Sequence, residues 1–142
     1  MNDNVLGDLI ELHDAAGDLE GYTATVASSQ GPLELQILLY GTPLSETLPL
    51  ARDFATRIDA HLDAARSHLI SSFLPMHNAG YLEDGVRPVS EDAFLAKAGT
   101  PLASIDLDGE ISFTYGHEDL LWGHWMGISI HPDGSVDTDI SG

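Results

Sequence analysis

The residues best suited to chemistry gather in the last part of the chain, between Gly116 and Gly142. Both tryptophans and three of the seven histidines lie there. Imidazole and carboxylate groups bind zinc, manganese or iron, and three such ligands with one open position form a hydrolytic site. One hypothesis is therefore a small metal-dependent hydrolase, whose ligands would be His117, Asp119, His124 and His131.

The spacing of these residues does not identify such a site. The chain contains no His-Glu-x-x-His, and His117 and His124 are seven residues apart. The alternative for His124 is structural, because a ring that follows Gly123 can hydrogen-bond backbone groups left between two strands. No Gly-x-Ser-x-Gly elbow and no Gly-x-x-x-x-Gly-Lys phosphate loop is present either. We therefore expect no catalytic residue, no cofactor and no resident metal.

The same segment offers aromatic side chains for binding, which often dominate protein interfaces when they are exposed on a rigid sheet. Phe113, Tyr115 and Trp122 are expected in the core, whereas Trp125 is expected either there or on a loop that presents it outward. The residues that we take as candidates for a binding surface are Trp122, Gly123, His124, Trp125, His117 and Asp119.

The net negative charge of the chain limits the classes of partner that it is expected to bind. Five Lys and Arg oppose 23 Asp and Glu, which gives a formal net charge of −18. Residues 1–51 and 98–142 carry 8 carboxylates each and no Lys or Arg. Nucleic acids and anionic membranes should be repelled, whereas a basic protein is the natural complement. Two alternatives stay open: the charge serves only solubility or salt adaptation, or the chain forms a homodimer.

Length and composition predict the general class of protein. A chain of 142 residues suits one domain, residues 1–142. Cysteine is absent, which excludes disulfides and thiolate chemistry. No apolar run approaches the roughly 18 residues of a membrane span. The acidic N-terminus lacks the cationic region of a signal peptide, so a cytoplasmic protein is expected.

The hydrophobic pattern predicts strands at both ends and helices between them. Period-two alternation over 22–26 and 33–39 predicts one hairpin, and Asp108-Gly109 and residues 131–135 predict two more turns. Apolar residues every three or four positions over 50–73 predict one long helix, which Ser45 or Thr47 would cap and Pro75 would end.

A second helix is predicted to begin after Ser90 and to end at Gly99. The predicted fold class is α+β, an antiparallel sheet from the N- and C-terminal strand segments with one face covered by the long central helix and the shorter one. The 16 carboxylates of the two ends would then lie on the open sheet face and its edges.

Several short segments of the C-terminal half form a recognisable series: 89–95, 111–115, 122–124, 128–130, 133–134 and 140–142. In this order they resemble the bacterial family catalogued as domain of unknown function 2262, whose hallmark is an aromatic-Gly-His step between a strand and a hairpin. The likeness covers residues 89–142, and residues 1–88 follow only the general order of strands and long helix. It implies a fold but no established activity.

The function expected from these observations is binding without chemistry. We predict an acidic module for a basic protein partner, such as a secreted nuclease toxin that it neutralises. The metal-dependent hydrolase stays the alternative.

Overall fold

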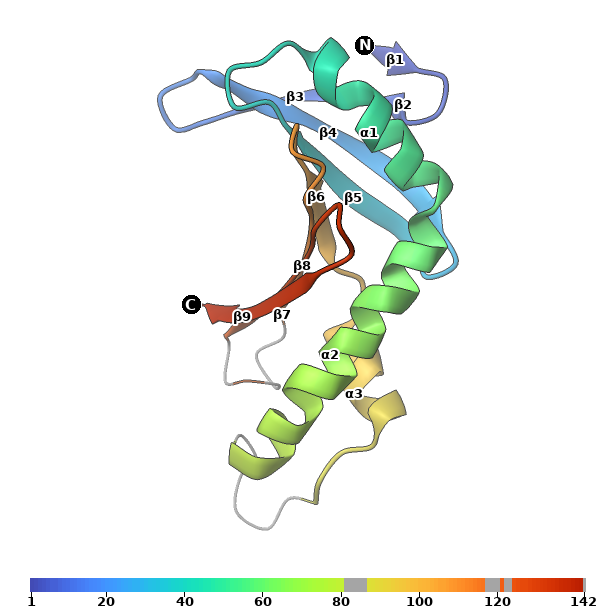
Figure 1. The fold of residues 1–142 in the computed structure, drawn as a ribbon, viewed down its shortest axis with the longest axis vertical. Coiled ribbons are helices and arrows are strands. Elements are labelled where there is room, and N and C mark those ends of the chain that lie inside the picture. The colour runs from blue at the N-terminus through green and yellow to red at the C-terminus, as the bar shows by residue number, and fades with distance from the viewer. Residues whose placement is uncertain (81–86, 117–120, 122–123, 142) are drawn as a thin grey trace.

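The computed structural model describes residues 1–80, 87–116, 121 and 124–141. Within these ranges three helices lie beside a seven-stranded sheet, which confirms the predicted α+β class (Figure 1). The helices are α1 (Leu44–Thr56), α2 (Ile58–Gly80) and α3 (Glu91–Ala98). A separate two-stranded sheet pairs β1 (Asn2–Asp3) with β2 (Gly7–Asp8).

The strands of the large sheet follow one another in space as they do in sequence. They are β3 (Ile10–His13), β4 (Leu19–Ser28), β5 (Gly31–Leu38), β6 (Leu102–Ile105), β7 (Ile111–Gly116), β8 (Trp125–Ile130) and β9 (Val136–Ser141). Among the described strands, neighbours pair antiparallel except β5 and β6, which are parallel because the three helices cross between them. The N- and C-terminal strands thus meet in one sheet, as predicted.

Both predicted C-terminal turns are confirmed. Gly109 and Gly134 take positive φ angles of 78° and 87°, which glycine adopts without strain. In the first turn, the Asp106 carboxylate accepts hydrogen bonds from two turn amides, at 2.9 and 3.3 Å. In the second, Asp133 accepts the amide of Ser135 at 2.9 Å. These short-range bonds fix the shape of each turn.

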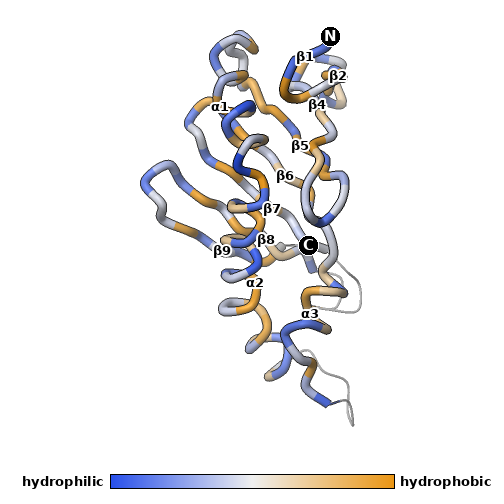
Figure 2. The backbone as a smooth tube through the Cα atoms, turned by 90° about the vertical axis from the view of Figure 1, so that its right-hand side faces the viewer, coloured by the Kyte–Doolittle hydropathy of each residue, from blue (hydrophilic) through white to orange (hydrophobic). Residues whose placement is uncertain are grey.

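The core lies between the helices and one face of the sheet. Alternate strand residues such as Leu35, Phe113 and Ile128 are fully buried there, and Figure 2 shows hydrophobic and hydrophilic residues changing along the strands. Leu62 and Leu69 of α2 are equally buried. Burial of each such side chain contributes roughly 1.5–3 kcal/mol to folding. The packing of these side chains therefore determines which face of the sheet lies against the helices.

The opposite, open face of the sheet is rich in hydroxyl groups. The register places these Ser and Thr residues on it: Thr23, Thr25, Ser104, Ser112, Thr114 and Ser129. By the same register, its described carboxylates are Glu34, Asp137 and Asp139. The expectation that the acids cover this face is therefore mostly wrong, although acids do occupy the turns and edges. Aspartate is unfavourable within strands, whereas in turns its carboxylate accepts backbone amides.

The single long helix predicted over 50–73 is wrong, because the chain forms two helices that meet at Arg57 (Figure 1). The Arg57 amide donates to the carbonyls of both Asp53 and Phe54. The change of direction lets α1 pack on β5 and β6, while α2 packs on β8 and α3. No glycine or proline marks the break, and the apolar period continues through it, so the sequence carries no signal for it.

The predicted ends of the helix are also corrected. α1 begins with Pro43 at its N-cap position, and neither Ser45 nor Thr47 caps it. Thr47 is fully buried, and its hydroxyl finds no hydrogen-bond partner among the described residues.

Pro75 lies inside α2 and does not end it. A proline in a helix interior costs about 3 kcal/mol, so other contacts must hold the last turn. His77 is buried with its ring centroid 5.6 Å from that of Phe94 in α3. The Asn78 side chain exchanges two hydrogen bonds with the backbone of Val89, at 3.0 and 3.1 Å. Packing against α3 thus outweighs the helix-breaking tendency of the proline.

The shorter helix begins and ends as predicted. The Ser90 hydroxyl accepts the amide of Ala93 at 3.2 Å, and Gly99 at the C-cap has a positive φ of 67°. In the described ranges, no helix combines the length and the continuous apolar surface that crossing a membrane requires.

Asp3 is an exception among the carboxylates of the N-terminal region, because it is buried. Its carboxylate accepts Arg52 Nε at 2.9 Å and also Arg52 Nη2, together with the amides of Val5 and Leu6 at 3.0 Å. The Arg52 hydrogen bonds, helped by these amides, lower the pKa of Asp3 to about 2. One of the few cations of the chain is therefore used to neutralise an acid at the N-terminal corner.

Candidate functional site

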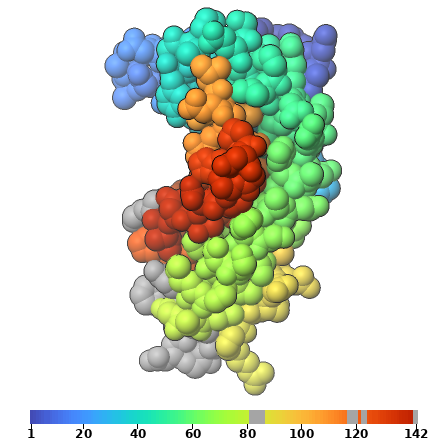
Figure 3. Space-filling view, viewed as in Figure 1, coloured from blue at the N-terminus to red at the C-terminus, as the bar shows by residue number. Residues whose placement is uncertain are grey.

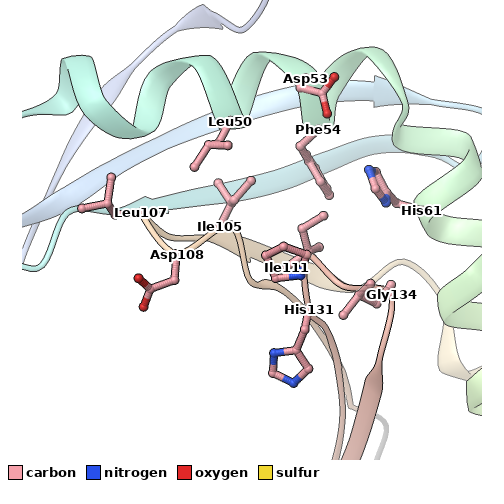
Figure 4. Close-up of a pocket in the computed structure, with 13 residues that line it drawn as sticks. Leu50, Asp53, Phe54, His61, Ile105, Leu107, Asp108, Ile111, His131 and Gly134 are labelled. Carbon is pink, nitrogen blue, oxygen red and sulfur yellow. The ribbon is translucent and has the colours of Figure 1, made fainter.

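A cavity of about 470 Å³ lies between the two helices near Arg57 and the turns that join β6 to β7 and β8 to β9 (Figure 4). We call it the turn cavity. Its volume is within the ~300–1,000 Å³ typical of small-molecule sites. Its lining includes Leu50, Asp53, Phe54, His61, Ile105, Asp108, Ile111, Ile130 and His131.

The floor of the turn cavity is apolar. Leu50 and Phe54 come from the sheet-facing side of α1, and Ile105, Ile111 and Ile130 come from the strand ends. Phe54 is buried, and its ring centroid lies 6.0 Å from that of Phe113 in the core. The floor is therefore continuous with the core.

His61 contributes an uncharged polar wall. Its ring stacks on Phe54 with centroids 5.3 Å apart and an interplanar angle of 11°. Burial lowers the pKa of His61 below its usual value. The imidazole is consequently neutral at pH 7, and it adds hydrogen-bonding capacity without positive charge.

Carboxylates flank the cavity on two sides. Figure 4 shows Asp53 on α1 and Asp108 on the β6–β7 turn, on opposite sides of the apolar floor, with both carboxylates directed away from it. Asp53 lies 3.3 Å from Arg57 Nε, and both side chains are largely exposed. Such surface pairs are worth about 1 kcal/mol or less, so an incoming cation can compete with Arg57 for Asp53.

His131 lines the cavity on the side of the β8–β9 turn, and its side chain is hydrogen-bonded to β9. Its Nε2 lies 2.7 Å from Asp137 Oδ2, and because a carboxylate only accepts, the imidazole donates this hydrogen bond. The bond to Asp137 raises the pKa of His131, and the charges of Glu110 and Asp133 add to the effect. These three acids extend the negative surface around the cavity, which no Lys or Arg lines in the described part of the chain.

Several residues predicted for the binding surface or the metal site lie outside the described residues: His117, Asp119, Trp122 and Gly123. His124 directly precedes β8, and its amide donates to the carbonyl of Leu121 at 3.1 Å. His131 directly follows the same strand. At ~3.3 Å per residue the two histidines are about 23 Å apart, so one ion cannot bind both. Elsewhere too, the described residues bring no three His, Asp or Glu side chains together for a metal.

Trp125 is 49% exposed at the start of β8. It pairs across the strands with Gly116, and a Cβ added to Gly116 would lie 2.3 Å from the Trp125 ring. The glycine thus makes room for an indole that lies over Gly116 of β7. Trp125 was expected either in the core or on a loop that presents it outward. The structure places it at the surface, as in the second expectation, but on a strand and not on a loop.

Phe113 and Tyr115, the other aromatic residues of this region that the structure describes, are in the core, as predicted. Both are at most 1% exposed. Burial raises the pKa of Tyr115 to about 12, and its hydroxyl finds no hydrogen-bond partner among the described residues. Neither ring is available to a partner.

The turn cavity itself was not predicted from the sequence, although its two turns were. In a meander of antiparallel strands, the β6–β7 and β8–β9 turns fall at the same end of the sheet, so their proximity follows from the topology. His61 enters the cavity only because the helix changes direction at Arg57. That break has no sequence signal, so His61 could not be assigned to the cavity from the sequence.

No family model, curated protein or solved structure matches the chain. The resemblance to the family catalogued as domain of unknown function 2262 stays a prediction.

Proposed function

We propose that the protein is a binding module for a basic protein, and that the partner contacts the surface around the turn cavity. One observation carries the proposal. An apolar floor and a surrounding set of carboxylates occur together at the turn cavity, and among the described residues no Lys or Arg lines it. Apolar floors supply affinity, whereas rim charges such as Asp108, which has no ion-pair partner among the described residues, supply steering and specificity.

The distribution of charge over the elements supports this proposal. No described strand contains Lys or Arg; the cations lie on α1, at Arg57, on α2 and α3, and at Arg87. Of these cations, Arg52 and Arg57 are paired with Asp3 and Asp53. The carboxylates of the strands and of the turns that join them therefore have no Lys or Arg in the same elements, and their charge would speed the encounter with a basic surface.

A toxin that the protein neutralises is one example of such a partner. High-affinity neutralisation needs both fast association and slow dissociation, and the cavity offers an apolar contact for the second. The hydrolase alternative gains no comparable support from the described residues, because His124 and His131 flank opposite ends of β8.

Two double variants test the proposal at equal charge. Asp108→Lys with Glu110→Lys changes the cavity region, and Asp18→Lys with Glu34→Lys changes exposed acids elsewhere by the same amount. Basic proteins are captured on each immobilised variant at low and at high salt and quantified. We expect the cavity variant to lose the captured partner at least about tenfold more than the control, which equals ~1.4 kcal/mol. Equal losses, or no basic protein retained by the native chain at either salt, would contradict the proposal.

A further inference from the structure

We infer that the turn cavity receives the aliphatic ammonium side chain of a lysine that the basic partner presents. This inference rests on the proposed function and assigns a ligand chemistry to its contact site. It follows from the shape of the cavity, the kind of surface that lines it and the position of its charges.

The apolar floor suits an alkyl chain. Leu50, Phe54 and Ile130 line the cavity with hydrocarbon, and the neutral His61 ring lies against Phe54 at 5.3 Å. A lysine side chain buries its methylenes on such a surface while its charged end stays at the mouth. Each fully buried methylene raises affinity by up to about fourfold. The imidazole of His61 adds no positive charge to the wall, and His131, whose pKa is raised, is paired with the Asp137 carboxylate, so that pair adds no net positive charge either.

The carboxylates favour an ammonium group over a guanidinium group. Asp53 and Asp108 belong to different elements and lie on opposite sides of the cavity (Figure 4). Both carboxylates are directed away from the floor, so an ammonium that emerges from the cavity on a flexible stem can turn toward one of them, whereas a planar guanidinium must lie in the plane of the carboxylate that it pairs with. In the described part of the chain, Asp108 has no ion-pair partner, so an ammonium there replaces no existing cation.

Small ligands test this inference without knowledge of the partner. Hexylammonium is titrated into the isotope-labelled native chain, and the amide shifts of Gly109 and Gly134 are followed by NMR. Hexanol, which lacks the charge, and propylammonium, which lacks half of the chain, are the matched controls. We expect hexylammonium to bind at least about fivefold more tightly than either control. Hexanol binding equally well, or hexylguanidinium binding more tightly, would overturn the assignment.

A pair of variants separates the cavity from the general acidic surface. Asp108→Asn should weaken hexylammonium binding by about two- to fivefold, the range for an exposed ion pair, and leave hexanol binding unchanged. Asp18→Asn removes the same charge elsewhere and should have no effect. If both variants weaken hexylammonium equally, the cavity is not the site. Should that happen while the Lys double variants still separate, the lysine inference fails and the proposed function stands.

Discussion

The two ends of strand β8 differ in what they present to solvent. At its start, Trp125 lies half-exposed over Gly116, and at its end Ile130 and His131 line the turn cavity. The strand is six residues long, so its two ends are roughly 17 Å apart. Figure 3 shows the hairpin of β8 and β9, in red, crossing the middle of the molecule beside α2. We call them the Trp125 end and the cavity end.

The Trp125 end offers an aromatic surface, and the cavity end offers an apolar hollow with charges around it. An exposed indole on a strand can bind many partners weakly. A cavity with an apolar floor and charges at fixed positions selects ligands that match its shape and its charge. Rare residues drew attention to the first end, but ordinary leucines, isoleucines and aspartates build the second. Of the two ends, only the cavity end combines, among the described residues, a hollow with an apolar floor and nearby carboxylates.

The largest expected effect is on stability at the cavity end. Phe54→Ala removes a buried ring that contacts both His61 and Phe113, and should lower the free energy of unfolding by about 3–5 kcal/mol. Trp125→Ala, at the other end, removes a half-exposed ring and should cost clearly less. Urea denaturation of both variants measures the difference. A Trp125→Ala loss as large as that of Phe54→Ala would show that the indole is part of the core.

The next effect concerns the packing at the Trp125 end. Gly116→Val places side-chain atoms where the indole now lies, and should cost about 1–3 kcal/mol as Trp125 is displaced. Gly80→Ala is the control, because a Cβ there meets nothing within 4 Å. Denaturation and the fluorescence of Trp125, recorded with Trp122 replaced by Phe, report the change. An unchanged emission spectrum would contradict the stacking of Trp125 on Gly116.

The smallest effect is a pH dependence at the cavity end. The bond from His131 to Asp137 raises the pKa of the imidazole, so it stabilises the fold below the unfolded pKa of His131. That stability is lost as the pH rises through the folded pKa. Asp137→Asn should therefore lower the pKa of His131, measured by NMR titration, and reduce stability at pH 5.5 more than at pH 8.5. An unchanged pKa would show that the hydrogen bond does not form in solution.

Most of the fold could be predicted from the sequence, because its signals are local. Asp108-Gly109, the 131–135 turn and the Ser90 cap are formed by neighbouring residues, and each was placed correctly. The helix break at Arg57 and the passage of α2 through Pro75 depend on packing against other elements. His77, which holds the last turn of α2, is buried only because α3 lies beside it.

The candidate site could be predicted less well for the same reason. Asp108 and His131 are 23 positions apart in sequence, and His61 is much further from both. These residues line one cavity only after the meander and the two helices are assembled. Residues close in sequence, such as those around Trp125, could be grouped by inspection, but proximity along the chain did not place them at the cavity.

Amide-shift mapping with a lysine-rich decapeptide tests most directly whether the cavity end is the contact region. The peptide is titrated into the labelled chain, and shifts at Gly109 and Gly134 are compared with those at Gly116 and Gly127, which lie at and next to the Trp125 pair. We predict saturable shifts at the first two glycines and little change at the others. Larger shifts at Gly116 and Gly127, or equal shifts at all four, would contradict the account.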